Sequence, residues 1–267
     1  MPGIGQDRSS PNRWLSNCII DEAASCRLLC FNSAGAGATL FRQWDRQSSR
    51  ALNVVGLQLP GRENRFAEPP LRDVHELVEQ VGPALLELLD RPYALFGHSY
   101  GSLLAFEVAR WLRRQGLPAP RHLFVAGRPA PQLPHRFRKT YDLPEQEFID
   151  ILRRYGGTKE SILGNLPAIR QFLPTIRADL EANTLYAYRE EPPLECDITA
   201  MRGDTDALCE EDELLAWREQ TAHRFQYLFF EGGHFFHTEE SEQLLRHVEA
   251  ALDNTAPHPT RLEPGNG

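Results

Sequence analysis

The sequence has no long apolar stretch, no excess of positive charge and no paired cysteine motif, and each absence excludes a class of protein. Apolar runs such as Leu123–Ala126 are far shorter than the ~20 residues of a membrane span, and residues 1–16 lack the hydrophobic segment of a signal peptide. The 29 Lys+Arg against 37 Asp+Glu give a net charge of −8, which excludes a general nucleic-acid binder. The five cysteines lack CxxC spacing, so we expect reduced thiols rather than zinc ligands or disulfides. We therefore expect a cytoplasmic protein without a membrane anchor.

What the sequence does contain is an alternation of short apolar segments with longer segments of helical pattern. The 267 residues are 41% apolar, which fits one or two domains with a sizeable core. Short, nearly continuous apolar segments are typical of parallel strands buried on both faces, and the helical segments between them favour right-handed βαβ crossovers. We predict an α/β fold with a mostly parallel central sheet flanked by helices. The predicted strands are Arg27–Phe31, Asn53–Leu59, Tyr93–Gly97, His122–Ala126, Asp197–Met201 and Gln226–Phe230.

Two helices are predicted from their apolar periodicity. Asp73 is a suitable N-cap for a helix whose apolar positions continue to Leu88, and Gly82-Pro83 is expected to bend it. The second helix has apolar residues at helical spacing over Gly101–Leu112 and stops at Gly116.

Three segments depart from this alternation. Residues 1–14 and 254–267 are rich in Pro, Gly, Ser and Asn, and we predict that they are flexible tails around a single domain of residues 15–253. The segment of about 130–195 has helical patterns and prolines but no good strand. A helical insertion of this length between strands indicates a lid over a site. The alternative is a peripheral helical subdomain that does not contact substrate.

A candidate nucleophile follows the third predicted strand. Gly97-His98-Ser99-Tyr100-Gly101 matches the G-x-S-x-G elbow, a sharp strand-to-helix turn that exposes a serine hydroxyl and whose glycines leave room for packing. The motif lies between a predicted buried strand and a predicted helix, as the elbow requires. A structural serine in an accidental turn is the alternative. His98 points elsewhere along the elbow, so we expect it to pack or to form a structural hydrogen bond, and Ser99 is the candidate nucleophile.

The acid and the base of a triad must follow the serine in that order on this scaffold. Asp204 and Asp206 lie just past the strand predicted at Asp197–Met201, where a carboxylate can orient an imidazole. Asp206 is favoured because it lies deeper in the loop, while Asp204 suits a turn contact. His234 directly follows a predicted strand, behind two glycines that allow the loop to approach the serine. His237 is its nearest competitor and is expected at the surface or at a helix start.

Acyl transfer also needs hydrogen-bond donors for the oxyanion. The backbone N–H of Tyr100, at the start of the helix after the serine, is one candidate. The other is expected from the small-residue loop Asn32–Gly37, directly after the first predicted strand. A nucleotide-binding loop is the weaker interpretation, because Gly35-Ala36-Gly37 lacks the third glycine and a Walker lysine.

Five motifs occur in order along the chain, and the elbow is one of them. They are Leu29-Cys30-Phe31-Asn32-Ser33-Ala34-Gly35-Ala36-Gly37, Gln58-Leu59-Pro60-Gly61-Arg62-Glu63, Gly97-His98-Ser99-Tyr100-Gly101, Gly127-Arg128-Pro129-Ala130-Pro131 and Gly232-Gly233-His234-Phe235-Phe236. Together they resemble the type II (external, editing) thioesterases of polyketide and non-ribosomal peptide synthesis, of the α/β-hydrolase superfamily. Arg177-Ala178-Asp179-Leu180 also fits the family's lid, and the similarity extends from about Trp14 to Leu252.

This resemblance implies an α/β-hydrolase fold with a helical lid, and hydrolysis of acyl thioesters on the phosphopantetheine arm of acyl or peptidyl carrier domains. By position it implies Ser99, Asp206 and His234 as the triad. It further implies Ala34 and Tyr100 as the residues whose amides form the oxyanion hole. We expect no cofactor and no metal. We also expect a monomer whose partners are carrier domains of a modular synthase, without nucleic acid or membrane.

Two positions depart from the family pattern. The loop that usually reads Pro-His-Ala-Gly-Gly is Asn32-Ser33-Ala34-Gly35-Ala36 here, which keeps Ala34 and Gly35 for backbone donors. Tyr100 replaces the Met or Leu commonly found after the nucleophile. We expect the ring of Tyr100 to project toward the acyl pocket and to alter the preference for chain length.

Two other functions remain open from the sequence. One is a product-releasing thioesterase or general esterase of the same fold, and the other is a non-catalytic carrier-binding module that retains the fold. The intact order of serine, aspartate and histidine argues against the second. Because carrier domains and this chain are both acidic, docking needs a local basic patch. Arg136-Phe137-Arg138-Lys139, at the start of the predicted lid, is the candidate, and a solvated loop is the alternative.

Overall fold

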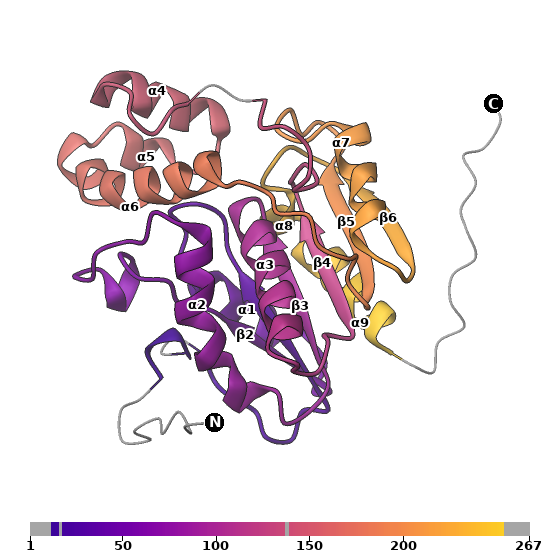
Figure 1. The fold of residues 1–267 in the computed structure, drawn as a ribbon. Coiled ribbons are helices and arrows are strands. Elements are labelled where there is room, and N and C mark those ends of the chain that lie inside the picture. Colours follow the sequence, from indigo (N-terminus) through magenta and orange to yellow (C-terminus); the bar gives the residue numbers. More distant parts are fainter. Residues whose placement is uncertain (1–11, 16–17, 137–138, 254–267) are drawn as a thin grey trace.

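The fold is built on one parallel sheet, as expected for short apolar segments separated by helices. The computed structural model describes residues 12–15, 18–136 and 139–253. Within these residues, six parallel strands lie in the order β2-β1-β3-β4-β5-β6 (Figure 1). The predicted α/β fold is therefore confirmed. The strands are β1 (Cys26–Phe31), β2 (Leu52–Gly56), β3 (Tyr93–His98), β4 (His122–Ala126), β5 (Asp197–Gly203) and β6 (Phe225–Phe230).

Helices cover both faces of this sheet (Figure 1). The described α-helices are α1 (Thr39–Gln47), α2 (Val74–Leu85), α3 (Tyr100–Arg114), α4 (Glu145–Tyr155), α5 (Glu160–Leu163), α6 (Leu166–Leu185), α7 (Glu211–Leu215), α8 (Phe236–Glu239) and α9 (Ser241–Leu252). Leu29 and Phe31 of β1 pack with α2 and α3, whereas Leu28 and Cys30 pack with α1 and α9. Successive side chains of one strand thus enter opposite apolar clusters, which explains the continuous apolar segment. None of the described helices is long and apolar enough to span a membrane.

The predicted helix after Asp73 is present, and the Asp73 side chain accepts a hydrogen bond from the Glu76 N–H at 2.8 Å. The α-helix ends at Leu85, and the chain continues as a 3₁₀ turn over Leu86–Leu88. Pro83 lies in the last turn of α2, where it supplies no N–H to the helix. Gly82 has a packing reason, because a Cβ there would lie 2.7 Å from the ring of Trp111 on α3.

Strand β2 is shorter than predicted, because the sheet ends at Gly56 instead of Leu59. The following residues bond to loops. Gln58 donates its backbone N–H to the Trp14 carbonyl, and its side chain joins the Ala38 N–H to the Arg62 carbonyl. Apolar residues therefore continue past the strand because the loop itself is buried.

The packed part of the chain begins earlier than the predicted boundary at residue 15. Asn12 donates to the Ala84 carbonyl at 2.8 Å, and Trp14 is buried beneath the guanidinium of Arg65. The assignment of residues 12–14 to a tail is thus wrong, because Trp14 fills a gap beside β2 and α2. The other parts of the predicted tails, residues 1–11 and 254–267, lie outside the described residues.

The segment between β4 and β5 contains α4, α5 and α6. These helices have an apolar cluster of their own, which includes Phe148, Ile169 and Leu173. They lie at one end of the sheet (Figure 1), and α6 contacts α3. No described residue of this segment joins the sheet, apart from a single bridge between Leu194 and Thr221. The helical character predicted for residues 130–195 is present, and a lid function remains a prediction.

Candidate active site

Ser99 occupies the sharp turn between β3 and α3 in a strained backbone conformation. Its φ is 54° and its ψ is −116°, a region that non-glycine residues rarely adopt and that costs about 1–3 kcal/mol. The glycines of the motif are required by close packing. A Cβ at Gly97 would lie 2.1 Å from the Gly101 carbonyl oxygen, and one at Gly101 would lie 2.1 Å from that of Phe31. The turn therefore has the geometry of a nucleophile elbow.

The elbow is tied to the neighbouring strand β4 by hydrogen bonds. The Ser99 N–H donates to the Ala126 carbonyl at 2.7 Å. The buried Ser102 hydroxyl lies 2.8 Å from the Gly97 carbonyl and 3.0 Å from both the N–H and the carbonyl oxygen of Ala126. These bonds hold Ser99 in its strained conformation at the carboxyl end of the sheet.

The structure brings Asp206 and His234 together. His234 Nδ1 lies 3.1 Å and 3.0 Å from the two carboxylate oxygens of Asp206, and both side chains are buried. The Leu208 N–H donates to the same carboxylate at 2.8 Å, which fixes its orientation. Asp204 instead accepts a hydrogen bond from the Gly232 N–H at 3.0 Å and is exposed. Of the two aspartates, Asp206 is therefore the one that orients the imidazole.

Two further histidines lie beside His234. His98 Nε2 donates to the His234 backbone carbonyl at 2.7 Å, so its hydrogen-bonding role is as predicted. The ring of His237 stacks on that of His98 with centroids 3.7 Å apart. His237 is the second residue of α8, which agrees with the expected helix start. It is buried, so the expected surface position is wrong. Burial lowers the pKa of His237 to about 3, and it lowers the pKa of His98 well below its usual range.

These depressed pKa values predict a loss of stability in mild acid. Unfolded histidines bind a proton below pH ~6.5, whereas folded His237 stays neutral, so the free energy of unfolding falls as the pH drops below ~6.5. Between pH 7 and pH 5, His237 alone contributes a loss of about 2 kcal/mol. We expect His237→Phe to reduce the change in the free energy of unfolding between pH 7 and pH 5, measured by urea denaturation, by that amount.

The matched control is His223→Phe, at an exposed position, which should leave the pH dependence unchanged. An equal flattening in both variants, or none in His237→Phe, would contradict this account of the buried pair.

The loop after β1 brings small residues to the edge of the same site. Ala34 and Gly35 line a cavity together with Ser99 and His234. Gly35 has a φ of +76°, and a Cβ there would lie 2.5 Å from Ile176 of α6. Tyr100 is the first residue of α3, where N–H groups have no partner within the helix. The backbones of Ala34 and Tyr100 are thus on the two segments that flank the serine.

A buried ion pair links this loop to α6. Both oxygens of the Asp179 carboxylate accept from the Arg62 guanidinium, at 2.6 Å and 2.8 Å. Asp179 also accepts the Gly35 N–H at 2.7 Å, and Arg62 donates to the Ala36 carbonyl at 3.4 Å. Both charged side chains are almost fully buried. The sequence placed Arg62 and Asp179 in family motifs without a role, and only the fold shows that they meet.

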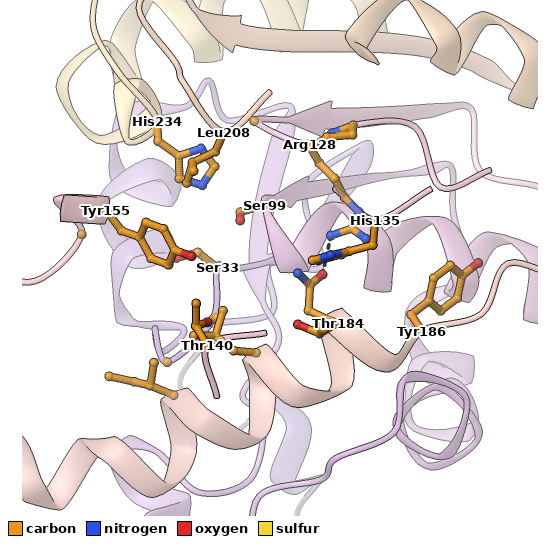
Figure 2. A pocket seen from close by; sticks show the side chains of 18 of the residues that line it. Ser33, Ser99, Arg128, His135, Thr140, Tyr155, Thr184, Tyr186, Leu208 and His234 are labelled. Carbon is orange, nitrogen blue, oxygen red and sulfur yellow. Dashed lines mark hydrogen bonds between the residues drawn. The ribbon is translucent and has the colours of Figure 1, made fainter. Parts of the chain in front are cut away.

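The cavity in front of Ser99 has a volume of about 530 Å³. Figure 2 shows the Ser99 hydroxyl in the middle of it, with His234 on one side and Arg128 on the other. Residues of α4, α5 and α6 form much of its wall, including Leu152, Ile169 and Ile176. The helical segment therefore contacts the site, contrary to the alternative of a peripheral subdomain.

Tyr100 does not line this cavity, which corrects the expectation that its ring projects toward the acyl pocket. The ring is buried in the core cluster beneath the elbow, and burial raises its pKa. The physical reason is the direction of the turn. At the strained Ser99 the serine lines the cavity, and the next residue begins α3 with its side chain in the core cluster. The predicted change in chain preference through Tyr100 loses its basis.

Comparison with known proteins agrees with this geometry. The family model described as a thioesterase domain matches residues 26–252. The chain belongs to the thioesterase family. It is 39% identical over 237 residues to the gramicidin S biosynthesis protein GrsT of Aneurinibacillus migulanus, covering 89% of this chain and 93% of that protein. The family model covers all the described strands.

Solved structures place this thioesterase among type II enzymes. One is RedJ, a thioesterase from the prodiginine pathway of Streptomyces coelicolor, with 37% identity and a TM-score of 0.80 over 91% of this chain and 94% of RedJ. Another is the type II thioesterase BorB from the borrelidin biosynthetic cluster, with 36% identity and a TM-score of 0.80 over 87% of this chain and 94% of BorB. The resemblance found in the sequence motifs is therefore confirmed.

Proposed function

We propose that this thioesterase uses Ser99, His234 and Asp206 to hydrolyse acyl thioesters on the phosphopantetheine arm of acyl or peptidyl carrier domains. One observation supports the roles most directly. The Asp206–His234 pair faces the same cavity as a serine in a strained elbow. GrsT, RedJ and BorB come by name from peptide, prodiginine and borrelidin biosynthesis, which supports a role beside a modular synthase.

The proposed reaction has two steps. Ser99 Oγ attacks the thioester carbonyl carbon while its proton passes to His234 Nε2, because Nδ1 is held by Asp206. The carbon–sulfur bond then breaks, and His234 returns the proton to the leaving sulfur. In the second step, His234 takes a proton from water, whose oxygen attacks the carbonyl carbon of the acyl-serine ester. The bond from that carbon to Ser99 Oγ then breaks, the acid is released, and His234 returns the proton to Ser99 Oγ. Residues supply every proton transfer in this scheme, so we propose that no cofactor takes part.

The oxyanion formed in each step needs fixed donors, each contributing about 3 kcal/mol to lowering the barrier. We assign this role to the backbone N–H groups of Tyr100 and Ala34. Tyr100 is the first residue of α3, so its N–H has no partner within the helix. The loop that contains Ala34 is held in place, because the N–H of the next residue, Gly35, donates a hydrogen bond to the Asp179 carboxylate.

We propose an editing role, in which removal of acyl groups from carriers clears stalled or misloaded chains, and the similarity to the type II thioesterase BorB supports it. The test is hydrolysis of a panel of acylated carrier proteins, with the carrier read by intact mass. We expect conversion of short acyl carriers to the free-thiol form. A preference for acyl-CoA or oxygen esters over acyl carriers would favour a general esterase, and a preference for full-length products would favour product release.

The third possibility, a carrier-binding module without activity, is tested on the same protein. A fluorophosphonate probe should label Ser99 and the label should be absent from Ser99→Ala. Carrier binding without labelling or hydrolysis by the unmodified protein would contradict the enzymatic proposal.

Docking through the predicted basic patch has less support than the chemistry. Arg136 forms ion pairs with Glu210 and Glu213, so its charge is already balanced within the chain. Phe137 and Arg138 lie outside the described residues, and Lys139 is exposed. Carrier docking at this segment stays a proposal, as does the monomeric state.

A further inference from the structure

Arg128 stands at the edge of the active site on a fixed backbone. It lies two residues after β4, and Gly127 before it is so close to the base that a Cβ there would be 3.2 Å from His234 Cε1. The Arg128 carbonyl accepts a hydrogen bond from the Trp217 indole at 2.8 Å. Figure 2 shows its side chain on the opposite side of Ser99 from His234. The guanidinium therefore faces the space that the bound substrate occupies.

The guanidinium of Arg128 has few hydrogen-bond partners within the described residues. Nη1 donates to the Asn183 side-chain oxygen, and Nε is buried without a hydrogen-bond partner. Among the described residues, no carboxylate forms an ion pair with it. Burial lowers its pKa to about 10, in agreement with an uncompensated charge. Such a group costs free energy unless another acceptor completes its hydrogen bonds.

The buried arginines of the described residues have carboxylate or backbone carbonyl partners, although the Nε of Arg27 is, like that of Arg128, buried without a hydrogen-bond partner. Carboxylates pair with four of them, and the fifth donates to backbone carbonyls. They are Arg27, Arg62, Arg65 and Arg110 in the first group and Arg202 in the second. Unlike these five, Arg128 has neither a carboxylate nor a backbone carbonyl partner among the described residues, and it faces Ser99 across the cavity.

We propose that Arg128 is a substrate-binding residue that takes a carboxylate or carbonyl oxygen of the bound thioester beyond the scissile group, an inference that rests on the proposed function. The planar guanidinium of Arg128 can donate hydrogen bonds to both oxygens of one carboxylate or to the oxygens of two carbonyl groups. The helical side of the cavity is apolar, through residues such as Ile169 and Phe172, and suits hydrocarbon. Arg128 and Asn183, which lies near the C-terminal end of α6, make another part of the wall polar, so the cavity selects acyl thioesters that bear an oxygen there.

The oxygen can belong to the acyl group or to the pantetheine arm, and four substrates separate these sources. Butyryl and malonyl groups are each presented on CoA, whose arm has amide carbonyls, and as S-ethyl thioesters, whose arm has none. Arg128→Met should lower kcat/KM for oxygen-bearing substrates at least about tenfold more than for butyryl S-ethyl thioester. A loss confined to malonyl substrates places the oxygen on the acyl group, and a loss confined to CoA substrates places it on the arm.

Arg170→Met is the matched control, because Arg170 is an exposed arginine of α6 paired with Glu145, outside the cavity. It should leave all four rates unchanged. An equal loss of all four rates in Arg128→Met, or no loss, would overturn the proposal.

Binding provides a readout that does not need hydrolysis. In the Ser99→Ala background, calorimetry should show malonyl-CoA binding that weakens at least about tenfold on adding Arg128→Met. An unchanged dissociation constant, or no binding in either variant, overturns the role of Arg128. Failure of the unmodified protein to hydrolyse any thioester contradicts the proposed function instead, and the two failures remain distinct.

Discussion

Replacing Ser99 with alanine should lower kcat for thioester hydrolysis by about 10⁶-fold, the loss that removal of a triad serine causes. The variant loses only the nucleophilic oxygen. Its backbone N–H still bonds the Ala126 carbonyl, and alanine adopts the strained φ of the turn no less readily than serine. The unfolding midpoint should therefore stay close to that of the unmodified chain. Single-turnover hydrolysis of an acyl carrier, followed by intact mass, measures the loss.

Ser102→Ala is the matched control for this substitution. The Ser102 hydroxyl forms three structural hydrogen bonds behind the elbow and does not line the cavity. We expect a lower unfolding midpoint and a much smaller loss of kcat than in Ser99→Ala. Retained turnover in Ser99→Ala would show that another group is the nucleophile.

Asp206→Asn should lower kcat by about 10⁴-fold, because an amide in place of the carboxylate disturbs the tautomer of His234 and no longer stabilises the imidazolium. The neighbouring Asp204→Asn gives a matched comparison two residues away. Asp204 is exposed, and the amide oxygen of asparagine can still accept the Gly232 N–H, so we expect less than about a threefold change.

The measurement for both variants is kcat with one acyl-carrier substrate at saturating concentration. Similar losses in the two variants, or a larger loss in Asp204→Asn, would contradict the assignment of Asp206. The comparison tests the choice that the sequence left between two aspartates of one loop.

Much of the fold was predictable because its signals are local. Strand His122–Ala126 has the predicted bounds, and the Asp73 cap is a contact across three residues. The elbow is partly local, since Gly97 is required by the Gly101 carbonyl within the turn, whereas Gly101 is required by the Phe31 carbonyl of β1. The nucleophile and the orienting aspartate could therefore be placed before the structure was known.

What escaped prediction depends on contacts between distant segments. Trp14 and Gln58 are 44 positions apart in the sequence. Their backbone hydrogen bond joins Trp14 to the packed part of the chain and Gln58 to a loop instead of the sheet. His237 of α8 is buried against His98 of β3, whose ring stacks on it. The Tyr100 ring is buried in a core cluster built from several distant segments, so the motif that predicts the turn does not show where the ring lies. The lack of a carboxylate or backbone carbonyl partner at Arg128 is evident only when the hydrogen bonds of the buried arginines are known, and the sequence does not give them.

The hydrogen bonds of Asp179 to both Arg62 and Gly35 restrict the movement of α6 relative to the sheet. Withdrawing α6 from the sheet would leave a buried charge without its partner, a change that costs about 3–5 kcal/mol. It would also release the Gly35 N–H and the bond between the Thr175 hydroxyl and the Gly61 carbonyl. The described contacts of α4 and α5 with the rest of the chain include no such buried pair. The lid motion predicted for this segment would therefore break no buried ion pair if it moved α4 and α5, with α6 remaining part of the frame that holds the loop after β1.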